Sequence, residues 1–191
     1  MKFWLRAFNI YLLAAVAVVG SGCGSNPSHL SAKKDYATLS IFMEGRPADS
    51  TPVQVGPYQT TMYIVPDAVL TEADLSKAKL VDNPNGTYAI ELSFNDHGKL
   101  VLDMQTTSNP GKHLIIFAKF PPRGWKEPAE EGAAAGKPPA EQPRISAWLA
   151  APMIPRNGIS NGSLQFAPDA THAEAAQIVR GLNNIVAELD K

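Results

Sequence analysis

The chain has 191 residues, of which 45% are hydrophobic and 18% charged, which suits one globular domain with tails and enough apolar content for a core. The formal net charge of -1 provides no basic field that would attract nucleic acid. Cys23 is the only cysteine, which excludes an intramolecular disulfide and any cysteine-based zinc or iron–sulfur site within the chain.

The N-terminal segment has the three regions of a secretory signal peptide. Lys2 and Arg6 give it a positively charged start, residues 7–19 are almost entirely apolar, and the small residues 20–22 precede Cys23. The apolar run is too short for a comfortable membrane span. We therefore predict that residues 1–22 are a lipoprotein signal peptide, which is removed before Cys23.

The Gly22-Cys23 pair resembles the lipobox that signal peptidase II recognises. That pattern usually has Leu three places before the cysteine, where this chain has Gly20. The resemblance implies lipidation of Cys23 with acyl chains such as palmitate, each buried CH₂ contributing about 0.8 kcal/mol to membrane binding. Gly24, which is not Asp, favours the outer membrane under the enterobacterial sorting rule, with the protein facing the periplasm. The alternative is an ordinary signal peptide, or an uncleaved anchor, with an incidental cysteine.

Residues 23–36 are short and polar, and we expect them to tether the lipid to a domain over 37–191. Alternating apolar residues predict a strand over 37–43 and a second over 60–65, separated by a loop with three prolines. The Thr71 capping-box pattern predicts a short helix through about Lys77.

The middle of the domain has the clearest periodicity. Residues 87–94 alternate apolar and polar, which predicts a strand with one buried face. A helix capped by Asn95 or Asp96 should follow, with an apolar stripe at Leu100, Val101 and Met104. Residues 113–120 are continuously apolar, which predicts a central strand covered on both faces.

Composition then shifts abruptly, because residues 121–143 hold six of the 16 prolines, with Glu, Ala, Lys and Gly between them. Such a stretch buries too little apolar area to offset its ordering entropy, so we predict a disordered loop within the domain. Strands over 144–151 and 163–167 should follow. A C-terminal helix starts at a capping box, Thr171 to Glu174, and its apolar stripe consists of Ile178, Leu182, Ile185 and Leu189, widened by Val179 and Val186.

This order of elements predicts an α+β fold, with a two-layer mixed β-sheet and helices packed on one face. The strand–helix–strand unit over 87–120 would form a right-handed crossover if its two strands are parallel.

Motifs for catalysis or metal binding are not found in the sequence. The four histidines have no metal-ligand spacing, and the chain has no nucleophile elbow and no glycine-rich phosphate loop. We therefore assign no catalytic, cofactor-binding or metal-binding residues. Two tryptophans are candidate partner contacts. Trp125 lies in the proline-rich loop, where the alternative is docking on its own domain, and Trp148 lies on a strand, where the alternative is a place in the core.

Several segments together resemble the P1 head of the periplasmic region of SecD and SecDF. The similarity covers roughly residues 69–189, more faintly from Leu39, and its order along the chain is the signal. The matching pieces are VLTEADL at 69–75, YAIELSFNDHG at 88–98, NPGK at 109–112, APMI at 151–154, the glycine-containing segment 158–166 and THAEAA at 171–176.

The resemblance implies a SecDF P1 head-like fold and a module that contacts emerging polypeptide outside the membrane. SecD also has membrane helices whose acidic residues conduct protons, and neither is expected in the mature chain. The tight hairpin between the two central strands of that head is replaced here by residues 121–143, and the Gly-Ala-Leu-Pro that follows its last helix is missing. No catalytic residue carries over.

These observations favour a non-enzymatic binding or accessory lipoprotein in the cell envelope, whose partner is an exported or envelope protein and which binds no nucleic acid. Fold alone does not decide function. One alternative is an envelope enzyme with an unrecognised site around His97, Asp96 and Glu91, and another is a structural lipoprotein without a specific ligand.

Overall fold

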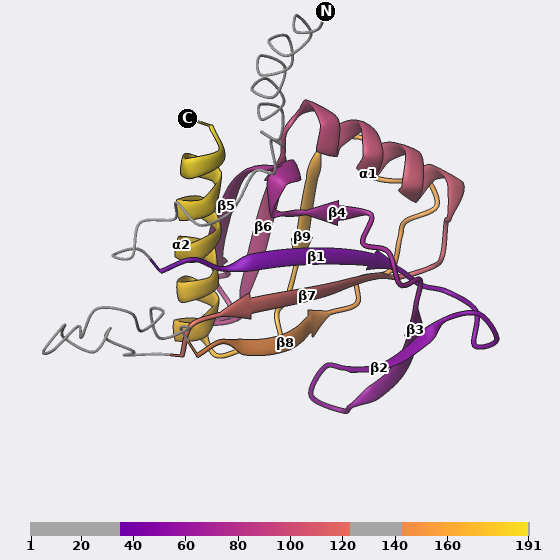
Figure 1. Cartoon of the computed structure of the whole chain (residues 1–191), viewed down its shortest axis with the longest axis horizontal. Coiled ribbons are helices and arrows are strands. Elements are labelled where there is room, and N and C mark those ends of the chain that lie inside the picture. Colours follow the sequence, from indigo (N-terminus) through magenta and orange to yellow (C-terminus); the bar gives the residue numbers. More distant parts are fainter. Residues whose placement is uncertain (1–34, 123–142, 191) are drawn as a thin grey trace, which may run out of the picture. The chain divides into compact units, whose positions relative to one another are not determined.

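The computed structural model describes residues 35–122 and 143–190, all of which belong to one unit of the chain, Ser31–Lys191. Figure 1 shows its elements. In chain order they are β1 (Thr38–Met43), β2 (Thr51–Val55), β3 (Thr60–Ile64), β4 (Leu70–Thr71), η2 (Glu72–Asp74), β5 (Leu75–Asp82), β6 (Tyr88–Phe94), α1 (Asp96–Ser108), β7 (Leu114–Phe120), β8 (Ile145–Ala150), β9 (Ser163–Phe166) and α2 (His172–Leu189).

The largest sheet has four antiparallel strands in the order β4-β1-β7-β8. Strand β7 lies between β1 and β8, with Leu114, Ile115 and Ile116 all buried, so the predicted central strand is confirmed. Because β7 and β8 are antiparallel neighbours, the proline-rich segment 121–143 connects two adjacent strands of one sheet. Most of this segment, which is predicted to be disordered, lies outside the described residues.

A second sheet has the order β5-β6-β9, also antiparallel, and β2 and β3 form a separate hairpin. The predicted α+β class is therefore confirmed, but the strands divide into three antiparallel sheets instead of one mixed sheet. The conditional crossover does not form, because β6 and β7 belong to different sheets. The predicted helix at 71–77 is a single 3-10 turn, after which the chain continues as β5.

The core lies between the two larger sheets and the helices. Alternation along β1 buries Leu39, Ile41 and Met43 on one face, and β6 contributes Ile90, Leu92 and Phe94. Helices α1 and α2 add Leu102, Ile178 and Leu182 to the same cluster. Each fully buried aliphatic or aromatic side chain of this kind contributes about 1.5–3 kcal/mol to folding.

Helix α1 begins where predicted, because the Asn95 side chain accepts a hydrogen bond from the Gly98 N–H at 2.9 Å. Of its predicted apolar stripe, Val101 packs against the core, but Leu100 and Met104 do not belong to a buried face, since they are 66% and 56% exposed. Leu102 and Thr106 are the α1 side chains that are buried instead. The helix therefore turns a narrower and more polar face to the core than the sequence indicates.

Helix α2 begins at the predicted capping box, in which Glu174 accepts from the Thr171 N–H at 2.8 Å and from its hydroxyl at 2.7 Å. Most of the predicted stripe is buried, although Leu189 is 60% exposed. Figure 1 shows α2 running alongside β5, whose outer edge it covers. Among the described residues, no helix is long and apolar enough to cross a membrane.

Candidate functional site

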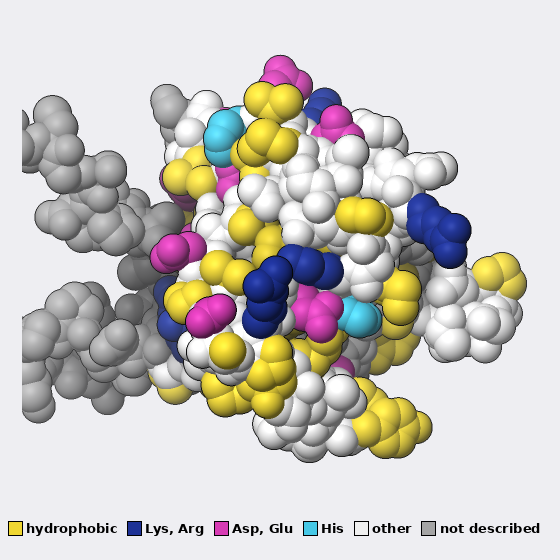
Figure 2. All heavy atoms as spheres, turned by 90° about the vertical axis from the view of Figure 1, so that its right-hand side faces the viewer, with side chains coloured by type: hydrophobic (Ala, Val, Ile, Leu, Met, Phe, Trp, Pro, Cys, Tyr) yellow, Lys and Arg dark blue, Asp and Glu magenta, His cyan; other side chains and the backbone are white. Residues whose placement is uncertain are grey.

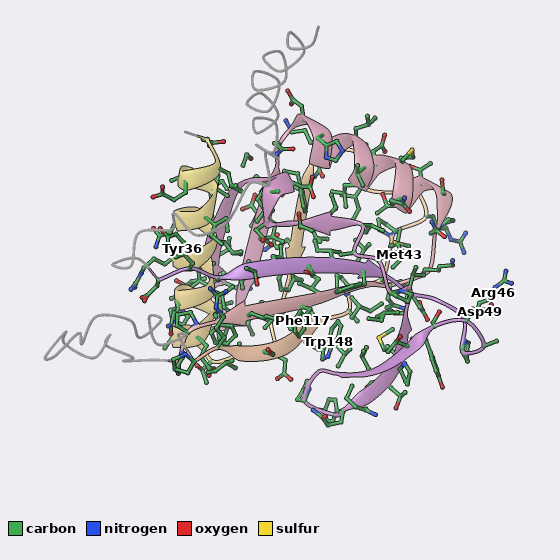
Figure 3. All side chains as sticks on the ribbon, in the orientation of Figure 1. Tyr36, Met43, Arg46, Asp49, Phe117 and Trp148 are labelled. Atoms are coloured by element: carbon green, nitrogen blue, oxygen red, sulfur yellow. The ribbon has the colours of Figure 1, made fainter. Side chains whose placement is uncertain are left out.

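Three aromatic side chains lie together on the face of the four-stranded sheet that points away from the main core. Phe42 comes from β1, Phe117 from β7 and Trp148 from β8. The Trp148 ring centroid lies 4.6 Å from that of Phe117 and 5.7 Å from that of Phe42, with tilted planes. Figure 3 shows Phe117 and Trp148 beside each other on neighbouring strands. Trp148 is half-buried, so this cluster is incompletely covered.

The β2–β3 hairpin covers one part of this aromatic face. Val55 and Ile64 of the hairpin are buried against Ile115 of β7, and Val53, Met62 and Trp148 pack partly buried around them. Residues 50–65, which contain the hairpin, include no charged side chain. Figure 2 shows the corresponding lower part of the molecule with hydrophobic and uncharged polar side chains. Tyr58, at the tip, is 91% exposed.

An open groove of about 530 Å³ lies between the hairpin and strand β8. Trp148 lines it together with its neighbours on β8, and Asp169 is its one charged lining residue among the described residues. The full lining consists of Pro52, Val53, Gln54, Gly56 and Gln59 from the hairpin side, Ser146, Ala147 and Trp148 from β8, and Asp169.

Asp169 marks one end of this groove. Its N–H donates to the carbonyl oxygen of Leu149 at 2.6 Å, which joins the segment after β9 to the edge of β8. The Asp169 residue is exposed. The groove therefore combines one aromatic side chain, Trp148, with uncharged polar and aliphatic side chains and a single carboxylate, which together suit a chain segment that has both apolar and polar groups.

Of the predicted partner contacts, the structure places Trp148 in the groove. Trp125 and the lipidation residue Cys23 lie outside the described residues. Trp148 also packs against a small second core, so part of its side chain is covered, while it lines the groove as well. Its role as a partner contact stays a prediction.

The three residues of the alternative enzyme site contact three different partners. His97 Nδ1 lies 2.7 Å from Asp74 Oδ1, Asp96 lies 3.5 Å from the Lys99 ammonium, and Glu91 accepts from Ser163 at 3.4 Å. The His97 side chain is 73% exposed. Within the described part of the chain, no hydrogen bond or ion pair joins these three residues into a constellation with a nucleophile and a base.

Histidine pairs with a carboxylate at two further places, His113 with Glu44 at 2.7 Å and His172 with Asp82 at 2.9 Å. Each pair joins elements that are distant in the sequence. Within residues 35–122 and 143–190, no group of three or more His, Cys, Asp or Glu residues could hold a metal ion. These histidines therefore connect elements of the domain.

The predicted strand at 60–65 is confirmed as β3, but β2, the hairpin strand that lines the groove, was not predicted, because Pro52 made its segment look like a loop. The alternation of Val53 and Val55, together with the absence of charge from 50 to 65, was the signal that could have found it.

No protein-family model and no curated protein matches this chain. Solved structures of SecDF match it. SecDF in its super-membrane-facing form aligns with 78% of this chain at 17% identity and a TM-score of 0.51, and this chain spans only 19% of its length. A second structure is described as a membrane component SecDF that enhances protein export. The alignment covers 88% of this chain and 72% of the SecDF chain, at 18% identity and a TM-score of 0.51. These matches establish a SecD-like fold for the domain.

Proposed function

We propose that this protein is a non-enzymatic, lipid-anchored module of the cell envelope that holds an extended segment of an exported or envelope protein. The groove between the β2–β3 hairpin and β8 carries the proposal. Its aromatic and uncharged lining suits the side chains of an unfolded segment, which has apolar groups to bury. The SecD-like fold supports it by analogy, since one of the matched structures is described as enhancing protein export.

The proposed location rests on the sequence of the first residues. The charged start, the apolar run and Cys23 together indicate export and lipidation, with Gly24 favouring the outer membrane. Two or more acyl chains on Cys23 would hold the domain at a membrane surface on the periplasmic side. Mass spectrometry of the native protein is expected to show a mature N-terminus at Cys23 carrying acyl groups, and an unmodified thiol would contradict the anchor.

The binding role is tested with a permanently unfolded polypeptide. The full chain in mild detergent is mixed with a reduced, carboxymethylated protein, and complex formation is followed by fluorescence anisotropy. We expect saturable binding by the wild-type chain. Trp148→Ala should weaken it by about tenfold, because an interface aromatic is worth roughly 1–2 kcal/mol when truncated.

Leu100→Ala provides a matched control, because Leu100 is an exposed apolar residue on α1 and does not line the groove. It should bind like the wild-type chain. Equal losses of affinity in the two variants would show that the polypeptide binds nonspecifically to exposed apolar side chains. That result would contradict the groove as the binding site. An absence of any binding by the wild-type chain would contradict the proposed function itself.

A further inference from the structure

We propose that the occupant of the groove binds as an added β-strand, through backbone hydrogen bonds to the free edge of β8, and carries a basic residue beside Asp169. This inference rests on the proposed function and specifies how the polypeptide is recognised. It follows from which backbone groups each strand edge leaves unpaired.

The hydrogen bonds of β7 determine which groups of β8 face outward. The Glu44 N–H donates to the His113 carbonyl oxygen, and the Leu114 N–H donates to the Pro152 carbonyl oxygen, each at 3.0 Å. Successive residues of β7 therefore bond alternately to β1 and to β8. In this register Ala147, opposite Ala118, bonds to β7.

Ser146 precedes Ala147 along β8, so its backbone N–H and C=O groups point away from β7. The β7–β8 register shifts between Ile116 and Phe117, so the regular alternation ends after Ala147. Ser146 and Trp148 both line the groove. In the part of the chain that the structure describes, no hydrogen bond beyond the sheet joins the backbone groups of Ser146 to another segment. A strand edge with unpaired groups is a template for another extended chain.

The facing edge of the groove, strand β2, is not equivalent. Pro52 lies opposite Tyr63, whose carbonyl oxygen accepts from the Gly45 N–H on the other side of β3 at 2.8 Å. The backbone of Pro52 therefore points away from β3, towards the groove that it lines. Since proline has no N–H, this edge lacks a donor at that position. An incoming strand would find both a donor and an acceptor at Ser146 on β8, whereas β2 lacks the donor at Pro52.

The edge of β5 is closed in another way. Helix α2 covers it, and the Asn183 side chain forms hydrogen bonds with the N–H and the C=O of Ala78. On β8, the backbone of Ser146 has no such partner in another element among the described residues. At Leu149 the edge is occupied, since the Asp169 N–H bonds to the Leu149 carbonyl oxygen. The added strand is therefore bounded at that end by Asp169.

Charge and shape then define the chemistry of the occupant. An added strand places every second side chain on the face that carries Trp148 and Phe117, so these positions should be apolar or β-branched. The Asp169 carboxylate is the one charged group among the described lining residues, so the residue beside it should be Lys or Arg.

The decisive test uses two labelled probes against the full chain in mild detergent. The first is a short peptide of alternating valine and threonine with one terminal lysine. The second has the same sequence but is N-methylated at alternate residues, which removes backbone donors and leaves the side chains unchanged. We expect the N-methylated probe to bind about tenfold or more weakly by fluorescence anisotropy, as expected if several backbone hydrogen bonds are lost.

A protein-side test compares Ser146→Pro with Ser146→Ala. The proline variant removes the outward N–H and the alanine variant keeps it, while both remove the hydroxyl. Ser146→Pro should weaken the first probe by about fivefold or more, and Ser146→Ala should change it by less than about twofold. Equal thermal unfolding of the two variants shows that the fold is intact. If Ser146→Pro fails to fold, the comparison of the two probes decides.

The role of Asp169 is tested with Asp169→Asn. This variant should weaken the lysine probe by a few-fold at low salt, and the loss should disappear for a probe with glutamine in place of lysine. Equal binding of the methylated and unmethylated probes would overturn strand addition while leaving the groove as a binding site. A failure of both probes and of the unfolded polypeptide to bind would instead contradict the proposed function.

Discussion

Asn183 of α2 binds both backbone groups of Ala78 on β5. Its Oδ1 accepts from the Ala78 N–H at 2.9 Å, and its Nδ2 donates to the Ala78 carbonyl oxygen at 2.9 Å. The amide thus takes the place of a neighbouring strand at an edge position, next to an irregularity in the β5–β6 register between Leu75 and Lys77. One side chain therefore both docks α2 and closes an edge that would otherwise be open.

Replacing Asn183 should destabilise the domain. Asn183→Ala leaves a donor and an acceptor of β5 unpaired in a part-buried position, and we expect the free energy of unfolding to fall by about 2 kcal/mol in urea titrations. Asn184→Ala is the matched comparison, because Asn184 makes one such bond, to the Asp35 carbonyl oxygen at 2.8 Å. It should cost about 1 kcal/mol. A smaller loss for Asn183 than for Asn184 would contradict this role.

Thr106 is the buried polar residue that joins α1 to the loop before β9. Its hydroxyl donates to the Leu102 carbonyl oxygen at 2.7 Å and accepts from the Ile159 N–H at 2.8 Å. Thr106→Val keeps the volume but leaves the Ile159 N–H unpaired, so it should lower stability by about 1–3 kcal/mol. Thr106→Ser retains the hydroxyl and should cost less, as measured by thermal and urea unfolding. Equal costs would show that packing of the methyl group, and not the hydrogen bond, determines the effect.

Gly181 allows α2 to approach the chain just before β1. A Cβ at this position would lie 2.6 Å from the Ala37 nitrogen and 2.7 Å from the Ala37 Cβ. Gly181→Ala should therefore destabilise the domain by about 1–3 kcal/mol, despite the gain of up to about 1 kcal/mol in helix propensity. Ala187→Gly, at an exposed position of the same helix, measures propensity alone and should cost up to about 1 kcal/mol. A stabilised Gly181→Ala protein would contradict the close approach.

Tyr36 precedes β1 and is 4% exposed, and its hydroxyl oxygen has no hydrogen-bond partner among the described residues. Figure 3 shows its position at the start of the domain. A buried hydroxyl without a partner costs about 1–3 kcal/mol. Tyr36→Phe removes the hydroxyl and retains the ring, so we expect unfolding to move to higher urea concentration. A loss of stability would reveal that the hydroxyl has a partner in the native protein.

Local sequence patterns predicted the elements that depend on interactions between residues close in the sequence, such as helix caps and alternating strand faces. Asn95 and the Thr171–Glu174 pair each begin a helix. In both, a side-chain oxygen within one turn accepts from the otherwise unpaired backbone N–H groups, so no distant part of the chain has to provide an acceptor. The alternation over Tyr88–Phe94 and the unbroken apolar run of β7 likewise report which faces are buried. The order of short motifs from residue 69 onwards was enough to indicate a SecD-like fold.

Tertiary structure alone decided how the strands are paired and where the groove lies. Strand β5 contains Lys77 and Lys79, and β2 contains Pro52, so their local preferences argue against strands. Both form because a neighbouring strand, and for β5 also α2, supplies the backbone partners. Strand preference depends mainly on such long-range contacts. The groove brings β2, β8 and Asp169 together from distant parts of the chain, and no local pattern carries that information.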